Sequence, residues 1–165
     1  MRVVDTRTAA AAQALVVDAA VEAARSGAPI DRVVQAAEDA AERAELVATL
    51  PTMEPLQRTG KVPANALEKA GAHGPAHLFR FRDGIVAVVD DHDDDPLDGV
   101  LAVWARNGGP AAPRSFVFHA DRADLAQRLR ERLGRNASVI DFSPAIALHT
   151  GPGTVGVAWL RPGAP

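Results

Sequence analysis

The sequence predicts an α+β (α/β) fold, in which a mixed or antiparallel sheet is covered by helices. The dipeptide Asp83-Gly84 stands between two short runs rich in β-branched and aromatic residues, and it is the strongest two-residue hairpin signal in the chain. Elsewhere apolar residues recur at helical spacing, as in Leu97, Val100, Leu101 and Trp104. We therefore expect strands paired mainly by hairpins, with the helices returning to one side of the sheet.

The N-terminal part of the chain predicts a β-α-α-β unit. Its expected elements are a strand at Arg2 to Asp5, a helix at Ala9 to Arg25 capped by Thr6 or Thr8, a second helix capped by Asp31, and a strand at Glu45 to Leu50. The helices carry mostly alanine on their apolar faces. Because alanine buries little apolar area, we expect this unit to pack against another surface.

The segment Pro51 to Pro63 is interrupted by prolines and Gly60, and we place a domain boundary there, giving domains 1–52 and 53–165. In the second domain we expect a short helix at Ala64 to Ala70, a helix through Leu97 and Trp104, and a helix capped by Asp121 and ended by Gly134. The expected strands are His77 to Arg82, Ile85 to Val89, Ser115 to His119, Ser138 to Phe142, Ala145 to Leu148 and Val155 to Leu160.

Composition excludes several classes of function. A net charge of −3 offers no basic face for nucleic acid. The absence of cysteine excludes a disulfide framework, a thiolate metal site and a cysteine nucleophile. Acidic residues interrupt the alanine-rich N-terminal run, which is unlike a signal peptide, and no stretch has transmembrane length. We expect a cytoplasmic protein with no membrane span.

The most conspicuous charge feature is the aspartate run from Asp90 to Asp95, which contains His92. A calcium loop of the EF-hand type needs a glycine at its sixth position and a glutamate at its twelfth, and this run provides neither. We interpret it as a solvated loop, with Asp95 or a neighbour favouring the start of the next helix. No metal or other cofactor is expected.

Two motifs offer candidate ligand-binding residues. An apolar run delivers His149 and Thr150 to the turn Gly151-Pro152-Gly153, where small residues let a ligand approach the backbone. This pattern favours a small site for an anionic group, and the alternative is a tight hairpin whose His and Thr satisfy local backbone groups. Arg58 and Lys61 form a cationic pair on a loop bounded by proline and glycine, which is either an anion contact or an ordinary solvated basic turn.

The motif from His149 to Gly153 resembles the His-x-Gly-Pro-Gly signature that closes the DegV family, bacterial proteins that bind a long-chain fatty acid in a two-lobed α/β fold. Three earlier segments also resemble segments of the family and occur in the same order as in the family: Val3 to Thr6, Met53 to Val62 and Phe118 to Asp121. The resemblance places the element with Arg58 and Lys61 at the cleft between the two lobes. We expect His149 and Thr150 to donate toward the fatty-acid carboxylate, and we count Gly151, Arg58 and Lys61 among the ligand-binding residues. Lys61 stands where the family has arginine, which keeps the charge but loses the bidentate fork.

The resemblance implies a fatty-acid-binding protein that performs no chemistry itself and offers its ligand to a fatty-acid kinase. Residues 1–52 then correspond to a remnant of the N-terminal lobe and residues 53–165 to the C-terminal lipid-binding domain, while the family's upstream carboxylate-binding segments have no counterpart. We expect an apolar cavity in the second domain, lined by Phe79, Phe81, Leu101, Trp104, Val117 and Leu148.

Two alternatives remain open. The first is a truncated interaction module that has lost lipid binding and acts in an oligomeric or split assembly, with a separate N-terminal-lobe polypeptide as partner. The second is an enzyme that uses His149 as general base, for which the sequence offers no orienting carboxylate. Because an unpaired strand at Val3 to Asp5 would need a partner, we also expect a homodimer.

Overall fold

The computed structural model describes residues 1–52, 54–58, 60, 77–89, 95–134 and 136–163. The helices are α1 (Ala10–Arg25), α2 (Ile30–Arg43), α3 (Glu54–Arg58), α5 (Pro96–Arg106), α6 (Ala123–Leu133) and α7 (Pro144–Thr150), with a 3₁₀ turn η1 (Gly109–Ala111). The strands are β1 (Ala44–Leu50), β2 (His77–Arg82), β3 (Ile85–Val89), β4 (Ser115–His119), β5 (Ala137–Asp141) and β6 (Val155–Leu160).

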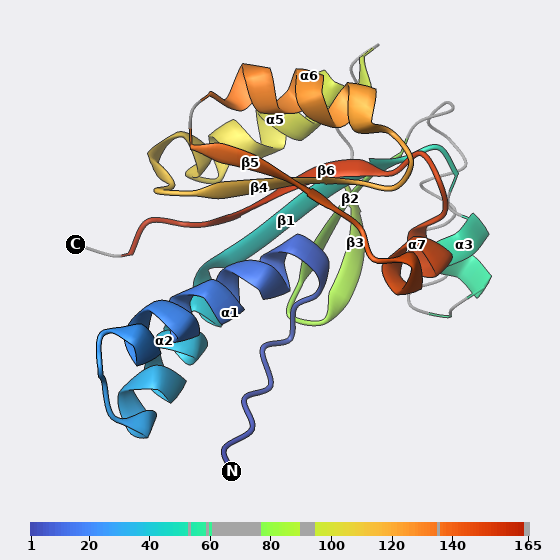
Figure 1. Ribbon diagram of the computed structural model, residues 1–165. Coiled ribbons are helices and arrows are strands. Elements are labelled where there is room, and N and C mark those ends of the chain that lie inside the picture. The colour runs from blue at the N-terminus through green and yellow to red at the C-terminus, as the bar shows by residue number, and fades with distance from the viewer. Residues whose placement is uncertain (53, 59, 61–76, 90–94, 135, 164–165) are drawn as a thin grey trace.

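One mixed sheet of six strands, in the order β3-β2-β1-β6-β4-β5, organises the molecule. The pairs are antiparallel except for β4 and β5, which run parallel. Helices α1 and α2 cover one face of the sheet, and α5 and α6 cover the other (Figure 1). The α+β class is confirmed, but the expectation that the helices lie on one side is wrong.

Strand β1 explains why both faces need helices. All seven of its residues are buried, so its side chains need apolar cover on the two opposite sides. Leu46 packs in one core with Leu15 of α1, whereas Val47 packs in the other core with Val100 of α5. The strand pairs with both β2 and β6, and the two units expected from the sequence thus share a single sheet.

The expected strand at Arg2 to Asp5 is wrong, because residues 1–9 form neither helix nor strand. The Asp5 carboxylate accepts a hydrogen bond from the Arg7 backbone N–H at 3.1 Å, and Arg7 adopts a φ of 46°. This turn bends the chain away from an extended course, and the Arg7 carbonyl accepts a hydrogen bond from Gly84 at the tip of the β2–β3 hairpin at 2.8 Å. The expected threonine, Asp31 and Asp121 caps also fail, because α1, α2 and α6 begin after Ala9, Pro29 and Arg122 without a side-chain cap.

The expected strand at Ala145 to Leu148 is helix α7. Proline at the first helical position presets a helical φ, and here Pro144 begins the helix after Ser143. Gly151, with φ of 79°, ends it and donates a hydrogen bond to the Ala147 carbonyl at 2.7 Å. A short apolar run has no periodicity of its own to separate helix from strand, and these flanking residues decide the outcome.

The remaining strands lie at or within one residue of their expected bounds. Asp95 caps α5 through a hydrogen bond from the Leu97 N–H at 2.9 Å, which confirms the expectation for the end of the aspartate run. The expected helix at Ala64 to Ala70 and the aspartates before Asp95 lie outside the described residues. In the part of the chain that the structure describes, no helix is long and apolar enough to cross a membrane.

Candidate functional site

An apolar cavity lies on the α1 side of the sheet, with a volume of about 160 Å³. Ten of its twelve lining residues are apolar, and the two polar ones are His149 and Thr150. The apolar lining consists of Ala9, Ala10, Leu46, Leu56, Phe79, Phe81, Val86, Phe118, Phe142 and Ile146. A mostly apolar hollow with a few polar groups at one place is the usual form of a small-molecule site.

Helix α7 presents the polar end of the cavity. Ile146, His149 and Thr150 are spaced by three and four residues and therefore share one side of the helix, which lines the cavity. Leu148 lies off this side and is 79% exposed. The helical course of this segment, and not the expected strand, decides which of its side chains reach the cavity.

His149 and Thr150 differ in their surroundings. Thr150 is buried, and its Oγ1 hydroxyl donates to the Ile146 carbonyl at 3.4 Å, one turn earlier in the helix. His149 is exposed, and its ring makes no hydrogen bond with any of the described residues. The imidazole can therefore turn to a ligand at the cavity. The threonine hydroxyl would have to give up two long local bonds, to the Ile146 carbonyl at 3.4 Å and to the Gly151 carbonyl at 3.5 Å.

The glycines of the turn make room for prolines. A Cβ on Gly151 would lie 3.0 Å from Cγ of Pro55, and a Cβ on Gly153 would lie 2.5 Å from Cγ of Pro51. Both glycines also have positive φ, which side chains disfavour. The turn thus allows close packing between the start of α3 and the end of α7, which is a structural role that the sequence motif alone did not reveal.

The second expected motif lies beside this turn. Helix α3 contacts α7 (Figure 1) and contributes Leu56 to the cavity. Arg58, on the same helix, is exposed and lies 3.9 Å from the Glu54 carboxylate. Lys61 lies outside the described residues. The structure therefore brings together His149, Thr150 and Leu56 at the cavity and leaves the Arg58 guanidinium on the adjacent helix.

Four of the six expected lining residues lie elsewhere. Phe79 and Phe81 line the cavity, as expected. Leu101, Trp104 and Val117 belong to the core under α5 and α6, on the opposite face of the sheet, and Leu148 points away. The error follows from the one-sided arrangement of helices that the sequence suggested. Phe118 and Phe142, which stack with ring centroids 4.7 Å apart, were missed as lining residues.

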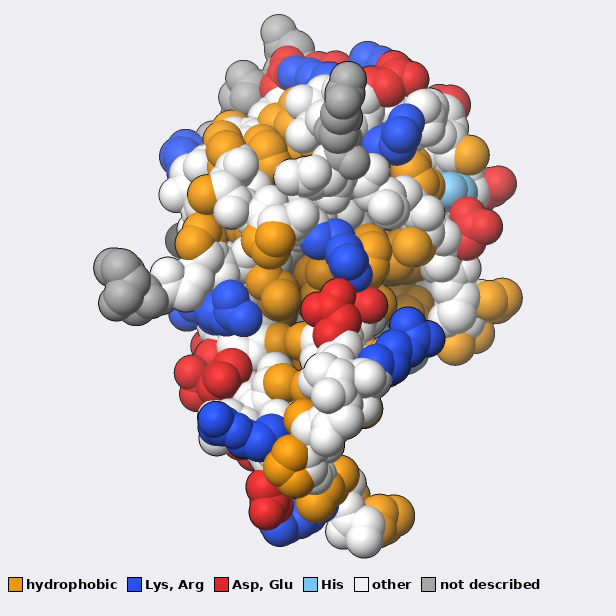
Figure 2. Space-filling view, turned by 60° about the vertical axis from the view of Figure 1, so that its left-hand side comes forward, with side chains coloured by type: hydrophobic (Ala, Val, Ile, Leu, Met, Phe, Trp, Pro, Cys, Tyr) orange, Lys and Arg blue, Asp and Glu red, His pale blue; other side chains and the backbone are white. Residues whose placement is uncertain are grey.

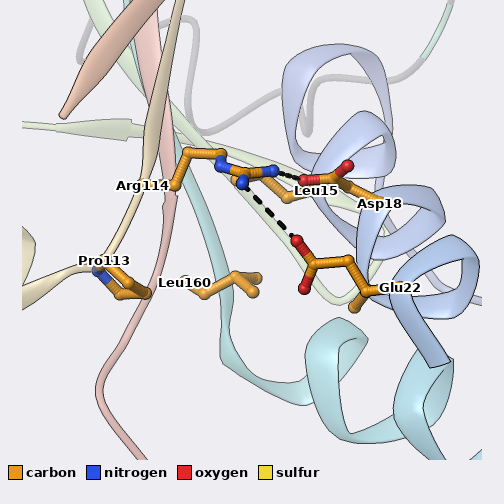
Figure 3. A pocket seen from close by; sticks show the side chains of 7 residues that line it. Leu15, Asp18, Glu22, Pro113, Arg114 and Leu160 are labelled. Atoms are coloured by element: carbon orange, nitrogen blue, oxygen red, sulfur yellow. Dashed lines mark hydrogen bonds and ion pairs between the residues drawn. The ribbon is translucent and has the colours of Figure 1, made fainter. Parts of the chain in front are cut away.

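Another hollow, between α1 and the loop before β4, is crossed by ion pairs (Figure 3). Arg114 reaches across to the carboxylates of Asp18 and Glu22 on α1, over an apolar floor that includes Leu15 and Leu160. The arginine and the two acids satisfy one another. This hollow, of about 150 Å³, therefore offers a ligand less than the apolar cavity does.

Charges on the surface are mixed in sign. On the face shown in Figure 2, blue and red side chains are interspersed with apolar surface.

The buried carboxylate of Glu45 forms ion pairs with the guanidinium groups of Arg80 at 2.6 Å, Arg161 at 3.2 Å and Arg82 at 3.6 Å. Within the described ranges, no group of three His, Asp or Glu side chains is placed to hold a metal ion.

Comparisons with known proteins point to one family. A family profile described as "Uncharacterised protein, DegV family" matches residues 1–91. A curated DegV domain-containing protein from Halalkalibacterium halodurans is 23% identical over 138 residues, which cover 74% of this chain and 46% of that protein. The chain thus spans less than half the length of this relative.

Solved structures agree on the fold. A DegV family protein from Corynebacterium glutamicum superposes with a TM-score of 0.84 at 22% identity, over 99% of this chain and 65% of that one. A Streptococcus pneumoniae protein, described as fatty acid kinase B3 protein loaded with linoleic acid, superposes with a TM-score of 0.84 at 14% identity, over 98% of this chain and 60% of that one.

Proposed function

The chain belongs to the DegV family, and from this premise we propose that it binds a long-chain fatty acid in the apolar cavity and performs no chemistry on it. The observation that carries the proposal is the lining of that cavity, in which ten apolar residues surround a space whose polar residues are His149 and Thr150. The linoleic acid bound to the pneumococcal neighbour supports the choice of ligand class.

The acyl chain would lie among the phenylalanines of β2, β4 and the segment after β5. Transfer of each methylene from water to an apolar site contributes about 0.8 kcal/mol at most, so a long chain supplies most of the binding free energy. The carboxylate would stand at the exposed end of α7, where the His149 ring can donate to it. Arg58, on the adjacent helix α3, would add positive charge there, with Lys61 as a second cation.

Two partners belong to the proposal. The pneumococcal neighbour's description as a fatty acid kinase protein supports a kinase that receives the bound acid. A homodimer is also proposed, although the strand at Val3 to Asp5 no longer supports it. Its remaining support is the outward line of α1, on which Val17 and Val21 are 50% and 36% exposed.

One observation favours an interaction module instead. The cavity of about 160 Å³ is smaller than the roughly 300 Å³ at which common ligand pockets begin. A space of this size holds a long acyl chain only if the lining moves apart or another surface extends it. A chain that binds no lipid by itself and contributes one wall of a shared cavity would have the same geometry.

A titration with the fluorescent fatty acid cis-parinaric acid, followed by displacement with palmitate, separates the two candidates. Ala9 is exposed and lines the cavity, so Ala9→Trp should cover its mouth and weaken binding at least about tenfold. Ala24→Trp, at an exposed position of α1 away from the cavity, is the matched control and should bind as the unmodified protein does. Absence of saturable binding to the unmodified protein would favour the interaction module.

A further inference from the structure

A groove on the outer side of α7 has no role in the proposed fatty-acid site. Its volume is about 410 Å³, and it lies at the carboxyl ends of the parallel strands β4 and β5. It is lined by His119, Ala120, Asp121, Asp141, Phe142, Pro144, Ala147, Leu148 and Pro152. Phe142 also lines the apolar cavity and thus separates the two spaces.

The histidine in this groove is held on both sides of its ring. His119 and Asp141 are direct partners in the β4–β5 register, and Nε2 of His119 lies 3.0 Å from Oδ1 of Asp141. The Arg122 backbone N–H points to Nδ1 at 3.4 Å. Because Nδ1 accepts and Nε2 donates, the ring has no nitrogen left to act as a general base. The pair therefore fixes the position of the Asp141 carboxylate, which is 87% exposed.

The groove carries negative charge that nearby cations leave unbalanced. Asp121 and Asp141 both line it, and no lysine or arginine does so among the described residues. Arg122 is close by, but both ends of its guanidinium fork are bound to the Asp124 carboxylate at 2.9 Å. A cationic group from outside would meet the Asp141 carboxylate, which pairs with His119, and the Asp121 carboxylate, which interacts with Arg122 only through longer-range attraction.

The floor of the groove is apolar. Leu148 is 79% exposed and lines the groove, together with the rings of Phe142, Pro144 and Pro152. Burial of such an exposed leucine side chain against a partner would be favourable, because it removes apolar surface from water. The acidic wall disfavours a lipid membrane or a nucleic acid as that cover, since both are anionic.

The walls are fixed by backbone hydrogen bonds. The Gly153 N–H donates to the Ala120 carbonyl at 2.7 Å, the Ala120 N–H donates to the Thr154 carbonyl at 2.9 Å, and the Phe142 N–H donates to the His119 carbonyl at 3.1 Å. These bonds join the ends of β4 and β5 to the turn before β6. A groove that is already formed avoids the entropic cost of ordering its walls when a partner binds.

We propose that this groove binds a segment of a partner protein that presents an arginine or lysine beside an apolar side chain. The cation pairs with Asp141 and Asp121, and arginine suits this role because its fork can bind a carboxylate through two hydrogen bonds. The apolar side chain covers Leu148 between the prolines. This docking surface does not depend on fatty-acid binding.

The test uses a blocked peptide with the order glycine, leucine, arginine, leucine, glycine, titrated to millimolar concentration into ¹⁵N-labelled protein. We expect saturable shifts of the amide resonances of Asp141, Ala147 and Leu148, and none with a peptide that has glutamate in place of arginine. Asp141→Asn and Leu148→Ser should each weaken binding by about two- to fivefold, since one exposed ion pair or contact is lost.

The control variants change an exposed acid and an exposed apolar residue at the β2–β3 hairpin. Asp83→Asn and Ile85→Ser should bind the arginine peptide as the unmodified protein does. Leu148→Ser removes no hydrogen bond, so it tests the groove even if Asp141→Asn disturbs His119. Absence of shifts at these amides, equal binding of the two peptides, or equal losses in the control variants would overturn the proposal.

Discussion

Replacement of His149 by alanine should separate ligand binding from folding. The His149 side chain is exposed, makes no hydrogen bond with the described residues, and lies in the last turn of α7. Alanine is the better helix former by up to about 0.7 kcal/mol, so the free energy of unfolding should stay within about 1 kcal/mol. For a chain of this size such a change shifts Tm by no more than about 4 °C.

Fatty-acid affinity should respond much more strongly. A hydrogen bond to a charged carboxylate contributes about 1.5–3 kcal/mol, which converts to a loss of roughly ten- to a hundredfold. Displacement of cis-parinaric acid measures the affinity, and thermal unfolding followed by circular dichroism measures the stability. Leu148→Ala, one residue away and pointing outward, is the matched control and should retain the affinity. A sharp fall in Tm with unchanged affinity would show that His149 is structural and refute the reasoning.

Three further predictions concern the framework of the site. Glu45→Gln leaves three arginines around a neutral side chain and should destabilise the fold by about 1–3 kcal/mol in urea unfolding, less than for a fully buried pair because the arginines reach water; unchanged stability would contradict this. Gly153→Ala would place a Cβ 2.5 Å from Cγ of Pro51 at a residue with φ of 92°, so it should lower the free energy of unfolding by about 1–3 kcal/mol in the same assay. An unchanged free energy of unfolding would show that the turn can relax. The hydrogen bond from Arg122 lowers the pKa of Asp124 to about 2, so the stability that this pair contributes is present above the ordinary pKa of 3.8 and is lost as pH falls toward 2. In an NMR titration, Arg122→Ala should return the Asp124 midpoint toward 3.8. An unmoved midpoint would refute the assignment.

Local signals predicted much of the framework. The turn dipeptide Asp83-Gly84 alone places the β2–β3 hairpin, because its residues tolerate the positive φ that the turn requires. Gly134 ends α6 where expected for the same kind of reason. Alternating or continuous apolar runs correctly indicated β1, β4 and β6.

The errors arise where tertiary contacts decide. A strand buried on both faces usually consists of a continuous apolar run. In β1 that run is interrupted by Glu45 and Thr49, although all seven residues are buried, so the sequence did not show that helices cover both faces. The four apolar residues at Ala145 to Leu148 fit a strand or a helix equally well until Pro144 and Gly151 are taken into account. Because this segment is a helix and not a strand, His149 and Thr150 lie on one side of α7 and not in the turn where they were expected.

The site itself was predictable only in part. Its polar end stood in the motif around His149, but the aromatic lining comes from Phe118 and Phe142, which the sequence separates from that motif. The pairing of His119 with Asp141 depends on the register of two parallel strands, which no local pattern specifies. Residues joined by long-range register can be found only when the sheet is known.

The central claim is that this chain holds a long-chain fatty acid by itself. Mass spectrometry of the organic extract from denatured, freshly purified protein tests it most directly, with an unrelated protein purified from the same cells as control. We predict a near-stoichiometric amount of fatty acid in the extract, reduced in Ala9→Trp and retained in Ala24→Trp. Protein that carries no fatty acid above the control, and takes up none when palmitate is added, would contradict the account.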